Sequence, residues 1–324
     1  MAVYIICPSG TTTGGVESLH QLGYMIKSTG RTVYMSYYPD PSGGITSQYF
    51  TNYGLSVQHP IDAENSIIVV PEIATYWLKQ FIHAKLVVYW LSVDNYLCRK
   101  HESLFIDVYK RIRSLTSSRI PVFFMKRFHH ITQSEYANNY LLKKGIVSTY
   151  IGDYLNDYFY EELAKVKSFT NCKSDQVAFN PRKGSKYIEY VSSLDPSINF
   201  VPIVNMSRSQ VLDTLLHSKI YIDLGHHPGR DRIPREAAAL GCCIITSIKG
   251  SANNNVDVPL PDQYKYRLSN KSLNKLPSQI KFIFNNYSDE FLVFQNYRSI
   301  IQNDRSTVTN NVSNWISTID PKPL

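Results

Sequence analysis

Short, continuous apolar segments recur along the first half of the chain, and segments with helical periodicity separate them. These runs are AVYIIC (residues 2–7), TVYMSYY (32–38), SIIVV (66–70), KLVVYW (85–90) and IPVFFM (120–125). Continuous apolar strands are typical of parallel sheets that helices cover on both faces. The alternation therefore predicts a doubly wound α/β domain, closed by a short strand at VSTYI (147–151).

The same alternation starts again in the second half. Its apolar runs are QVAFN (176–180), NFVPIV (199–204), KIYIDL (219–224) and CCIITS (242–247). Between the halves, residues 152–174 are polar, rich in tyrosine and weakly patterned, which predicts a domain boundary. We expect a Rossmann-like domain at residues 1–160, a second one at 175–290 and a helical segment at 291–324. Within the second half, Ser207 and Gln210 form a capping-box pattern that predicts the start of a helix.

The composition fits a globular protein of two domains. The 324 residues are 43% hydrophobic and 19% charged, with a net charge of +8. This basic surplus favours anionic partners such as phosphates or acidic lipid. The charge is spread along the chain, and no basic, aromatic-laced recognition element is visible, so nucleic acid is not an expected partner.

Cysteine use and the N-terminus predict a cytoplasmic protein. The five cysteines have neither metal-ligand spacing nor a disulfide framework, which fits a reducing compartment; they are Cys7, Cys98, Cys172, Cys242 and Cys243. The chain enters a predicted strand at once, without a signal peptide, and no apolar run is long enough to span a bilayer. Peripheral contact with a membrane surface stays an open alternative.

The segment YIDLGHHPGRDRIPREAAALGCCIITS (221–247) has a polar loop at the carboxyl end of a buried strand, which is where open α/β sheets bind ligands. Pro234 suits the first helical position and Gly241 the stop. The helix start would offer backbone N–H groups to an anion. Arg230, Arg232 and Arg235 can bind phosphate oxygens.

Glu236 would lie in the first turn of this short helix, where its carboxylate can accept hydrogen bonds from two hydroxyls of a ribose. In the alternative, Glu236 only caps its helix and Asp231 only pairs with a neighbouring arginine. The adjacent His226 and His227 have no third ligand at a recognisable spacing, so we expect no metal site.

The stretch from Pro234 to Ile245 resembles the donor-site motif of the GT-B glycosyltransferases, in particular the family 4-like group, with the pattern E-G-F-G-x-P-x-x-E-A-x-A-x-G-x-P-V-I. The resemblance implies that Glu236 binds the ribose of a nucleotide-sugar. Pro228 stands where the motif has its first glutamate, which leaves the sugar contact and the stereochemistry open. The implied fold is GT-B: two Rossmann-like, doubly wound domains that face each other across a cleft, with C-terminal helices crossing back.

Two further stretches resemble the same family. FNPRKGSKYIEYV (179–191) is similar to the G-R-x-x-x-x-K-G stretch that holds the donor diphosphate, which implies this role for Arg182, Lys183 and Lys186. Such cations stabilise a leaving diphosphate, so neither a metal nor another cofactor is expected. CPSGTTTGGVESLHQLGYMI (7–26) is similar to the glycine loop of the first domain. Gly14 and Gly15 would then let donor phosphate and acceptor approach, or else form only a tight turn.

Two carboxylates are candidates for a general base that removes the acceptor proton. Asp94 follows the buried KLVVYW strand, and Glu17 follows the glycine pair. Either can instead be a capping or ion-paired residue.

The resemblance implies a metal-independent glycosyltransferase that moves a sugar from a nucleotide-sugar to a glycan, glycolipid or other glycoconjugate. Two alternatives stay open: an inactive nucleotide-sugar-binding relative, and a nucleotide-sugar epimerase of the same architecture. The sequence does not define the donor sugar, its base, the acceptor, the stereochemistry or the oligomeric state.

Overall fold

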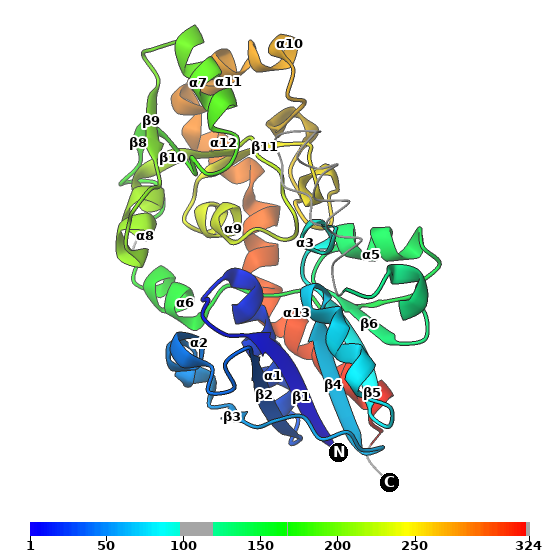
Figure 1. The fold of residues 1–324 in the computed structure, drawn as a ribbon. Coiled ribbons are helices and arrows are strands. Elements are labelled where there is room, and N and C mark those ends of the chain that lie inside the picture. Colours follow the sequence, from blue (N-terminus) through cyan, green and yellow to red (C-terminus); the bar gives the residue numbers. More distant parts are fainter. Residues whose placement is uncertain (98–118, 167, 322–324) are drawn as a thin grey trace. The chain divides into compact units, whose positions relative to one another are not determined.

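The computed structural model describes residues 1–97, 119–166 and 168–321, which form two compact units (Figure 1). Unit 1 consists of Met1–Tyr154 and Arg305–Leu324, and unit 2 of Leu155–Asp304. Each unit contains one parallel sheet with helices.

The sheet of unit 1 has seven strands in the order β3-β2-β1-β4-β5-β6-β7. They are β1 (Ala2–Pro8), β2 (Thr32–Tyr38), β3 (Ser56–Val57), β4 (Ser66–Pro71), β5 (Lys85–Trp90), β6 (His129–Thr132) and β7 (Thr149–Tyr150). Every pair is parallel, and the central strands are buried along most of their length. The prediction of a doubly wound α/β unit is confirmed.

The described helices of unit 1 connect these strands. They are α1 (Gly14–Ser28), α2 (Gly44–Tyr49), α3 (Val93–Tyr96), α5 (Glu135–Leu142) and the 3₁₀ segments η1 (Thr51–Tyr53), η2 (Glu72–Gln80) and η3 (Val122–Met125). Helix α5 is followed by Gly145 at φ +70°, a left-handed conformation that suits a helix end.

The predicted strand at residues 120–125 is wrong. This segment forms η3, and the strand that pairs with β5 is β6, which begins at His129. Phe123 and Phe124 are 68% and 64% exposed, so the apolar run does not enter the core. Pro121 also lacks the backbone N–H that an interior strand would need for its ladder.

The sheet of unit 2 has five parallel strands in the order β12-β11-β10-β8-β9. They are β8 (Ser174–Phe179), β9 (Asn199–Pro202), β10 (Ser218–Asp223), β11 (Cys243–Ser247) and β12 (Lys265–Tyr266). The four predicted strands are confirmed. Strand β12 was not predicted, because two residues are too short for a periodic signal.

The described helices of unit 2 are α6 (Asp157–Ala164), α7 (Ser185–Leu194), α8 (Arg208–His217), α9 (Arg232–Ala239), α10 (Asn270–Leu273), α11 (Leu276–Asn285), α12 (Tyr287–Val293) and the 3₁₀ segments η4 (Ser251–Asn253) and η5 (Asp262–Tyr264). At the start of α8, Ser207 Oγ accepts from the Gln210 backbone N–H, and Gln210 Oε1 accepts from that of Ser207. The predicted capping box is confirmed.

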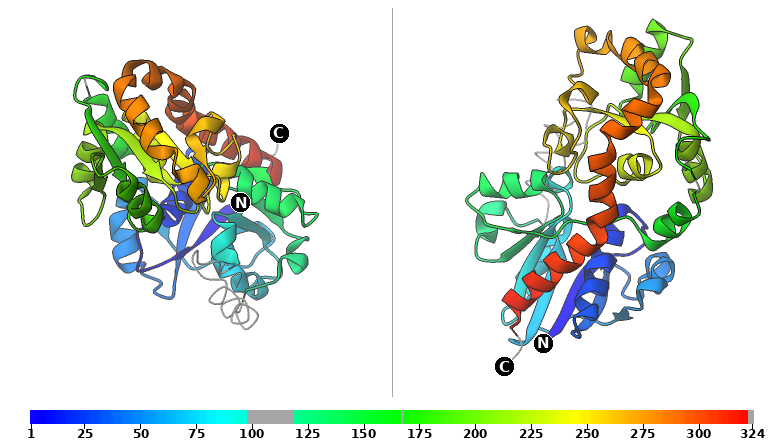
Figure 2. Two further views of the ribbon diagram at one scale, coloured as in Figure 1. Left: turned by 90° about the horizontal axis from the view of Figure 1, so that it is seen from above. Right: turned by 180° about the vertical axis from the view of Figure 1, so that it is seen from behind.

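The long helix α13 (Gln295–Ile319) begins in unit 2 and continues into unit 1. Its end lies beside the sheet of unit 1 (Figure 2). There Arg31 Nε is 2.9 Å from Asp320 Oδ2, and Lys85 Nζ donates to the Ile319 carbonyl at 2.9 Å. The expected return of the C-terminal helix to the first unit is confirmed.

The four described cysteines are free thiols, and Cys98 lies outside the described residues. Within the described part of the chain, no helix combines the length and apolarity needed to cross a bilayer.

Gly184 allows the loop after β8 to pass close to the end of β10. Its φ is +69°, and an added Cβ would lie 2.7 Å from the backbone carbon of Leu224. Gly184→Ala should therefore lower the stability of unit 2 by about 2 kcal/mol or more, since both the left-handed conformation and the contact with backbone oppose a side chain. Hydrogen exchange of the β8 and β10 amides measures this loss.

Gly14→Ala is the matched control for this substitution. A Cβ at Gly14 would meet nothing within 4 Å, and the residue begins α1. The stability of unit 1 should stay the same or rise slightly. Equal stability losses in the two variants would contradict the role given to Gly184.

Candidate functional site

The loops that follow the strands of unit 2 meet at the carboxyl edge of its sheet, because all five strands are parallel. The chain runs from β8 to β9 on one side and then to β10 on the other side of β8. Open α/β sheets usually bind ligands in a crevice at such a reversal, here beyond the ends of β8 and β10. The loop after β10 is the one that the sequence singled out.

Helix α9, which follows this loop, begins earlier than predicted. Asp231 is its N-cap residue and Arg232 its first residue, so Pro234 is third and Glu236 lies beyond the first turn. The expectations that Pro234 is first and that Glu236 is in the first turn are wrong. The helix starts two residues before Pro234 because Asp231 already adopts the capping conformation and Arg232 the helical one. Proline is tolerated in the first turn, so Pro234 does not have to be its first residue. The predicted stop is confirmed, with Gly241 at φ +89°.

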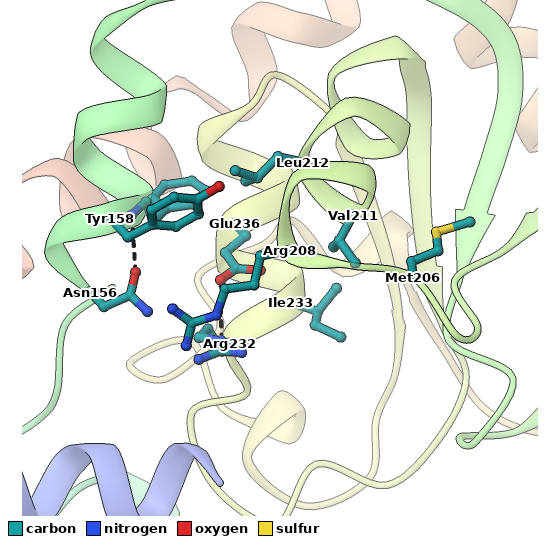
Figure 3. Close-up of a pocket in the computed structure, with 10 residues that line it drawn as sticks. Asn156, Tyr158, Met206, Arg208, Val211, Leu212, Arg232, Ile233 and Glu236 are labelled. Atoms are coloured by element: carbon teal, nitrogen blue, oxygen red, sulfur yellow. Dashed lines mark hydrogen bonds and ion pairs between the residues drawn. The ribbon is translucent and has the colours of Figure 1, made fainter. Parts of the chain in front are cut away.

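A cavity of about 180 Å³ lies beside Glu236, between the starts of α6, α8 and α9 (Figure 3). Its polar lining residues are Asn156, Tyr158, Arg208, Arg232 and Glu236. Its apolar ones include Phe159, Val211, Leu212 and Ile233. Pockets that enclose whole drug-sized ligands measure about 300–1,000 Å³, so this cavity fits one part of a larger ligand.

The charged groups of the cavity are arranged around the Glu236 carboxylate. Arg232 Nε lies 3.2 Å from Glu236 Oε1, and Arg208 extends beside the same carboxylate (Figure 3). The Arg208 guanidinium is also 5.8 Å from the ring centroid of Tyr158. The side chains of Glu236 and Arg232 are 10% and 36% exposed, and both line the cavity. The cavity thus combines an acceptor for hydroxyls, two cations and an aromatic ring.

Sequence reasoning missed Asn156, Tyr158, Met206 and Arg208. Arg208 is the first residue of α8, so the capping box at Ser207 carried a usable signal. Asn156 caps α6 by accepting from the Phe159 backbone N–H. It lies about 80 residues from Glu236 in the sequence, and no local pattern joins such positions.

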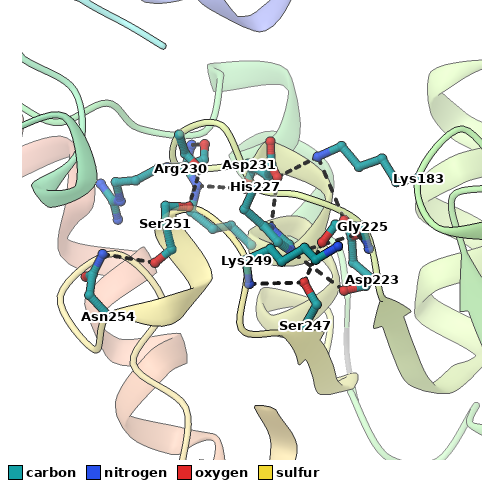
Figure 4. Close-up of polar contacts among 12 residues, drawn as sticks. Lys183, Asp223, Gly225, His227, Arg230, Asp231, Ser247, Lys249, Ser251 and Asn254 are labelled. Carbon is teal, nitrogen blue, oxygen red and sulfur yellow. Dashed lines mark hydrogen bonds and ion pairs between the residues drawn. The ribbon is translucent and has the colours of Figure 1, made fainter. Parts of the chain in front are cut away.

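Lys183, Asp231, His227 and Asp223 form a second polar cluster, the Asp231 quartet (Figure 4). Asp231 Oδ2 lies 2.6 Å from Lys183 Nζ and 2.9 Å from His227 Nδ1. Asp223 Oδ2 is 3.9 Å from Lys183 Nζ, and Asp223 Oδ1 is 3.7 Å from His227 Nε2. The cluster joins the loop after β8 to the loop after β10.

The pKa values of the quartet follow from these contacts. Burial alone would raise the pKa of Asp231, but the Lys183 ammonium and the His227 imidazole together lower it to about 2. Burial would lower the pKa of His227, and the carboxylates of Asp223 and Asp231 outweigh it and raise that pKa. The pKa of Lys183 is raised in the same way, by Asp231 and Asp223 against burial. Two cations thus balance two anions.

Asp223, His227 and Asp231 also offer ligand atoms within 4.8 Å of one another, a spacing that suits a cation. The Lys183 ammonium already supplies the positive charge among them. A divalent ion would have to displace it and deprotonate His227. His226 contributes no atom to this group.

Arg230 and Arg235 turn toward Asp304 of α13, within unit 2. Arg230 Nη2 donates to both carboxylate oxygens, at 2.9 and 3.0 Å, and Arg235 Nη1 donates to Oδ2 at 3.4 Å. Arg235 is 1% exposed and also donates to the backbone carbonyls of Asp231 and Arg230. These guanidinium groups fasten the loop before α9 to α13.

Arg182 and Lys186, the other two predicted phosphate ligands, are exposed on either side of Lys183. The Lys186 ammonium lies 5.2 Å from the ring centroid of Tyr187, and the Lys249 ammonium lies 5.9 Å from the same centroid. The start of α7 and the segment after β11 therefore both present positive charge near Tyr187.

Unit 1 holds the remaining predicted residues at the carboxyl edge of its own sheet. Gly14 and Gly15 begin α1 directly after the loop that follows β1, so the predicted strand-to-helix junction is confirmed. Glu17 is 7% exposed in α1. Asp94 is 1% exposed in α3, after β5, and accepts a hydrogen bond from Tyr136 Oη at 3.4 Å.

Glu72, which sequence reasoning missed, positions the segment that carries Asp94. It follows β4 and is 1% exposed, and its carboxylate accepts from the backbone N–H groups of Leu91 and Ser92 at 3.0 and 3.2 Å. Burial raises the pKa of this carboxyl to about 7 in spite of these bonds. Its position directly after a fully buried strand was the sequence signal that could have identified Glu72.

No protein-family model matches the sequence, and no curated protein is similar to it. The fold does match solved structures. HepE from Anabaena in complex with UDP has a TM-score of 0.67 at 12% identity, over 98% of this chain and all of that one. A glycosyltransferase from Rickettsia africae has a TM-score of 0.65 at 14% identity, over 99% of each chain.

WaaG, a glycosyltransferase of lipopolysaccharide biosynthesis, has a TM-score of 0.59 at 10% identity, over 99% of this chain and all of that one. These matches run through both units and the long C-terminal helix. The chain therefore has the GT-B fold of glycosyltransferases.

The quartet predicts how the stability of unit 2 depends on pH. The pKa of Asp231 is lowered, so its contribution is complete above about pH 4 and is lost as the pH falls toward 2. The pKa of His227 is raised, so its contribution is complete below about pH 6.5 and is lost as the pH rises through the folded-state value. Urea denaturation followed by far-ultraviolet circular dichroism measures both changes.

The His227→Gln variant should lose the alkaline part of this dependence. His83→Gln, at an exposed histidine of unit 1, should keep the profile of the unsubstituted protein. An unchanged alkaline profile in His227→Gln would contradict the ion pairs of the quartet.

Asp304→Ala should destabilise unit 2 by about 3–5 kcal/mol, because it leaves two buried guanidinium groups without this carboxylate. Asp289→Ala, at an exposed aspartate of α12, should change stability by less than about 0.5 kcal/mol. Thermal denaturation of both variants tests the difference. Similar melting temperatures would show that Asp304 does not hold the loop before α9.

Proposed function

We propose that the protein is a glycosyltransferase that binds the nucleotide part of a nucleotide-sugar in the cavity beside Glu236. The observation that carries this proposal is the placing of one accessible carboxylate and two guanidinium groups around a cavity at the carboxyl edge of a Rossmann-like sheet. A carboxylate can accept from both hydroxyls of a ribose, and arginine pairs well with phosphate oxygens. The GT-B fold supports the same assignment.

The donor diphosphate would lie toward the crevice between β8 and β10. Arg232, at the start of α9, offers a guanidinium and lies at the positive end of the helix dipole. Arg182 in the loop after β8 and Lys186 at the start of α7 are exposed, and Lys183 is held between them by Asp231. Arg230 and Asp231 would act indirectly, since their side chains already bind Asp304 and the quartet.

These cations would stabilise the charge that develops on the leaving nucleoside diphosphate. The transfer would then need no divalent metal. The charge balance of the quartet supports this, because Lys183 already neutralises the carboxylates that could bind one.

The acceptor, a glycan or glycolipid, would be bound by unit 1. Gly14 and Gly15 would leave room for substrate at the start of α1, where a Cβ on Gly14 would meet no neighbour. Asp94 or Glu17 would remove the acceptor proton in an inverting reaction. A retaining reaction would need neither Asp94 nor Glu17 as a base. Pro228 stands at the position of the family's first glutamate and supplies no carboxylate there.

HepE has been crystallised with UDP and with UDP and glucose, so UDP-sugars are the first donors to test. An inactive relative would bind nucleotide without catalysing transfer. An epimerase would convert the donor sugar in the absence of any acceptor. Product analysis with and without added glycan separates these alternatives.

Glu236→Gln should weaken nucleotide binding at least about tenfold, because it removes a charged hydrogen-bond acceptor worth about 1.5–3 kcal/mol. Glu189→Gln, at an exposed glutamate of α7, is the matched control and should bind as the unsubstituted protein does. Asp94→Asn and Glu17→Gln should both retain nucleotide affinity. The variant that lacks the general base should transfer the sugar about 10²–10⁴-fold more slowly. Calorimetry and release of nucleoside diphosphate give the two readouts.

Loss of nucleotide affinity in Asp94→Asn equal to that in Glu236→Gln would contradict this division of roles between the units. Unchanged affinity in Glu236→Gln would remove the ribose contact from the proposal.

A further inference from the structure

Unit 1 exposes four large apolar side chains on two neighbouring segments. Phe123 and Phe124 in η3 are 68% and 64% exposed, and their ring centroids are 5.6 Å apart. Leu142 and Val147, at the end of α5 and just beyond it, are 51% and 83% exposed. A folded protein does not gain stability by leaving such side chains in water, and adjoining exposed groups mark interaction sites.

The two segments lie side by side. Each comes just before a strand, β6 at His129 and β7 at Thr149, and these strands are parallel neighbours. Lys126 Nζ lies 3.4 Å from the position that a Cβ on Gly145 would occupy.

Basic side chains adjoin the apolar ones along both segments. Lys126, Arg127, Lys143 and Lys144 are all exposed, and the Lys126 ammonium lies 5.4 Å from the ring centroid of Phe123. Residues 119–146 contain five lysines and arginines and a single acidic residue, Glu135, which gives a net charge of +4 out of +8 for the whole chain. We call the eight apolar and basic residues the Phe–Lys face.

We propose that the Phe–Lys face docks unit 1 on an anionic lipid bilayer. The phenyl rings would enter the boundary between headgroups and acyl chains, and the lysines and arginine would lie among anionic headgroups. The charge of the face is complementary to such a surface.

This docking is independent of the proposed transferase activity. Both segments precede strands, so the Phe–Lys face lies at the amino edge of the sheet of unit 1. Gly14, Glu17 and Asp94 follow strands and lie at the carboxyl edge. A protein docked through this face would keep the carboxyl edge of unit 1 away from the contact.

Cosedimentation of the full chain with lipid vesicles tests the proposal without any nucleotide. Two compositions are compared: pure phosphatidylcholine, and phosphatidylcholine with one part in three replaced by phosphatidylglycerol. The protein should bind the anionic vesicles, and added salt should weaken that binding. Phe123→Ser with Phe124→Ser should weaken it about tenfold or more. Lys143→Gln and Lys144→Gln should each weaken it about fivefold.

Ile45→Ser is the matched control, since Ile45 is 60% exposed in α2, which follows β2 and therefore lies at the carboxyl edge, away from the Phe–Lys face. It should bind as the unsubstituted protein does, and circular dichroism confirms that each variant is folded. Three results would overturn the proposal: no binding to anionic vesicles, equal binding to both compositions, or undiminished binding of the double phenylalanine variant. Self-association without lipid that the same double variant abolishes would also overturn it, since the partner would then be a second copy of the chain.

Discussion

The Asp231 carboxylate holds together the two loops on which the candidate donor site depends. It accepts from Lys183 in the loop after β8 and from His227 in the loop after β10, and its residue is the N-cap of α9. Burying four charged groups is favourable only when their charges balance and their geometry is good. The quartet meets the first condition with two cations and two anions. It thereby fixes where α9 starts, and so where Arg232 and Glu236 stand.

The positions of the strands were predictable where the strands are buried, because a buried strand has a continuous apolar sequence. Strands β1, β4, β5, β10 and β11 are buried along most of their length and read as continuous apolar runs. The same rule failed at residues 120–125, where two phenylalanines stay exposed. Apolar character alone does not distinguish a buried strand from an exposed interaction surface, because the difference lies in what packs against the segment.

The residue types of the candidate donor site were predictable from the sequence, but the hydrogen-bond partners of its arginines were not. The loop before α9 was expected to present three arginines to phosphate, and two of them bind Asp304, about 70 residues further along the chain. The start of α9 was misplaced because Pro234 suits any position of a first turn. The far side of the cavity, with Asn156 and Arg208, comes from elements that only the folded sheet brings to Glu236.

Calorimetric titration of the unsubstituted protein determines whether a nucleotide binds beside Glu236. The titrants are UDP, GDP, dTDP, ADP and CMP, with EDTA present throughout. We expect saturable binding of one nucleotide in preference to the others, with one site per chain and no loss of affinity in EDTA. Folded protein that binds none of them would contradict the account, and binding that EDTA abolishes would contradict its metal-free donor site.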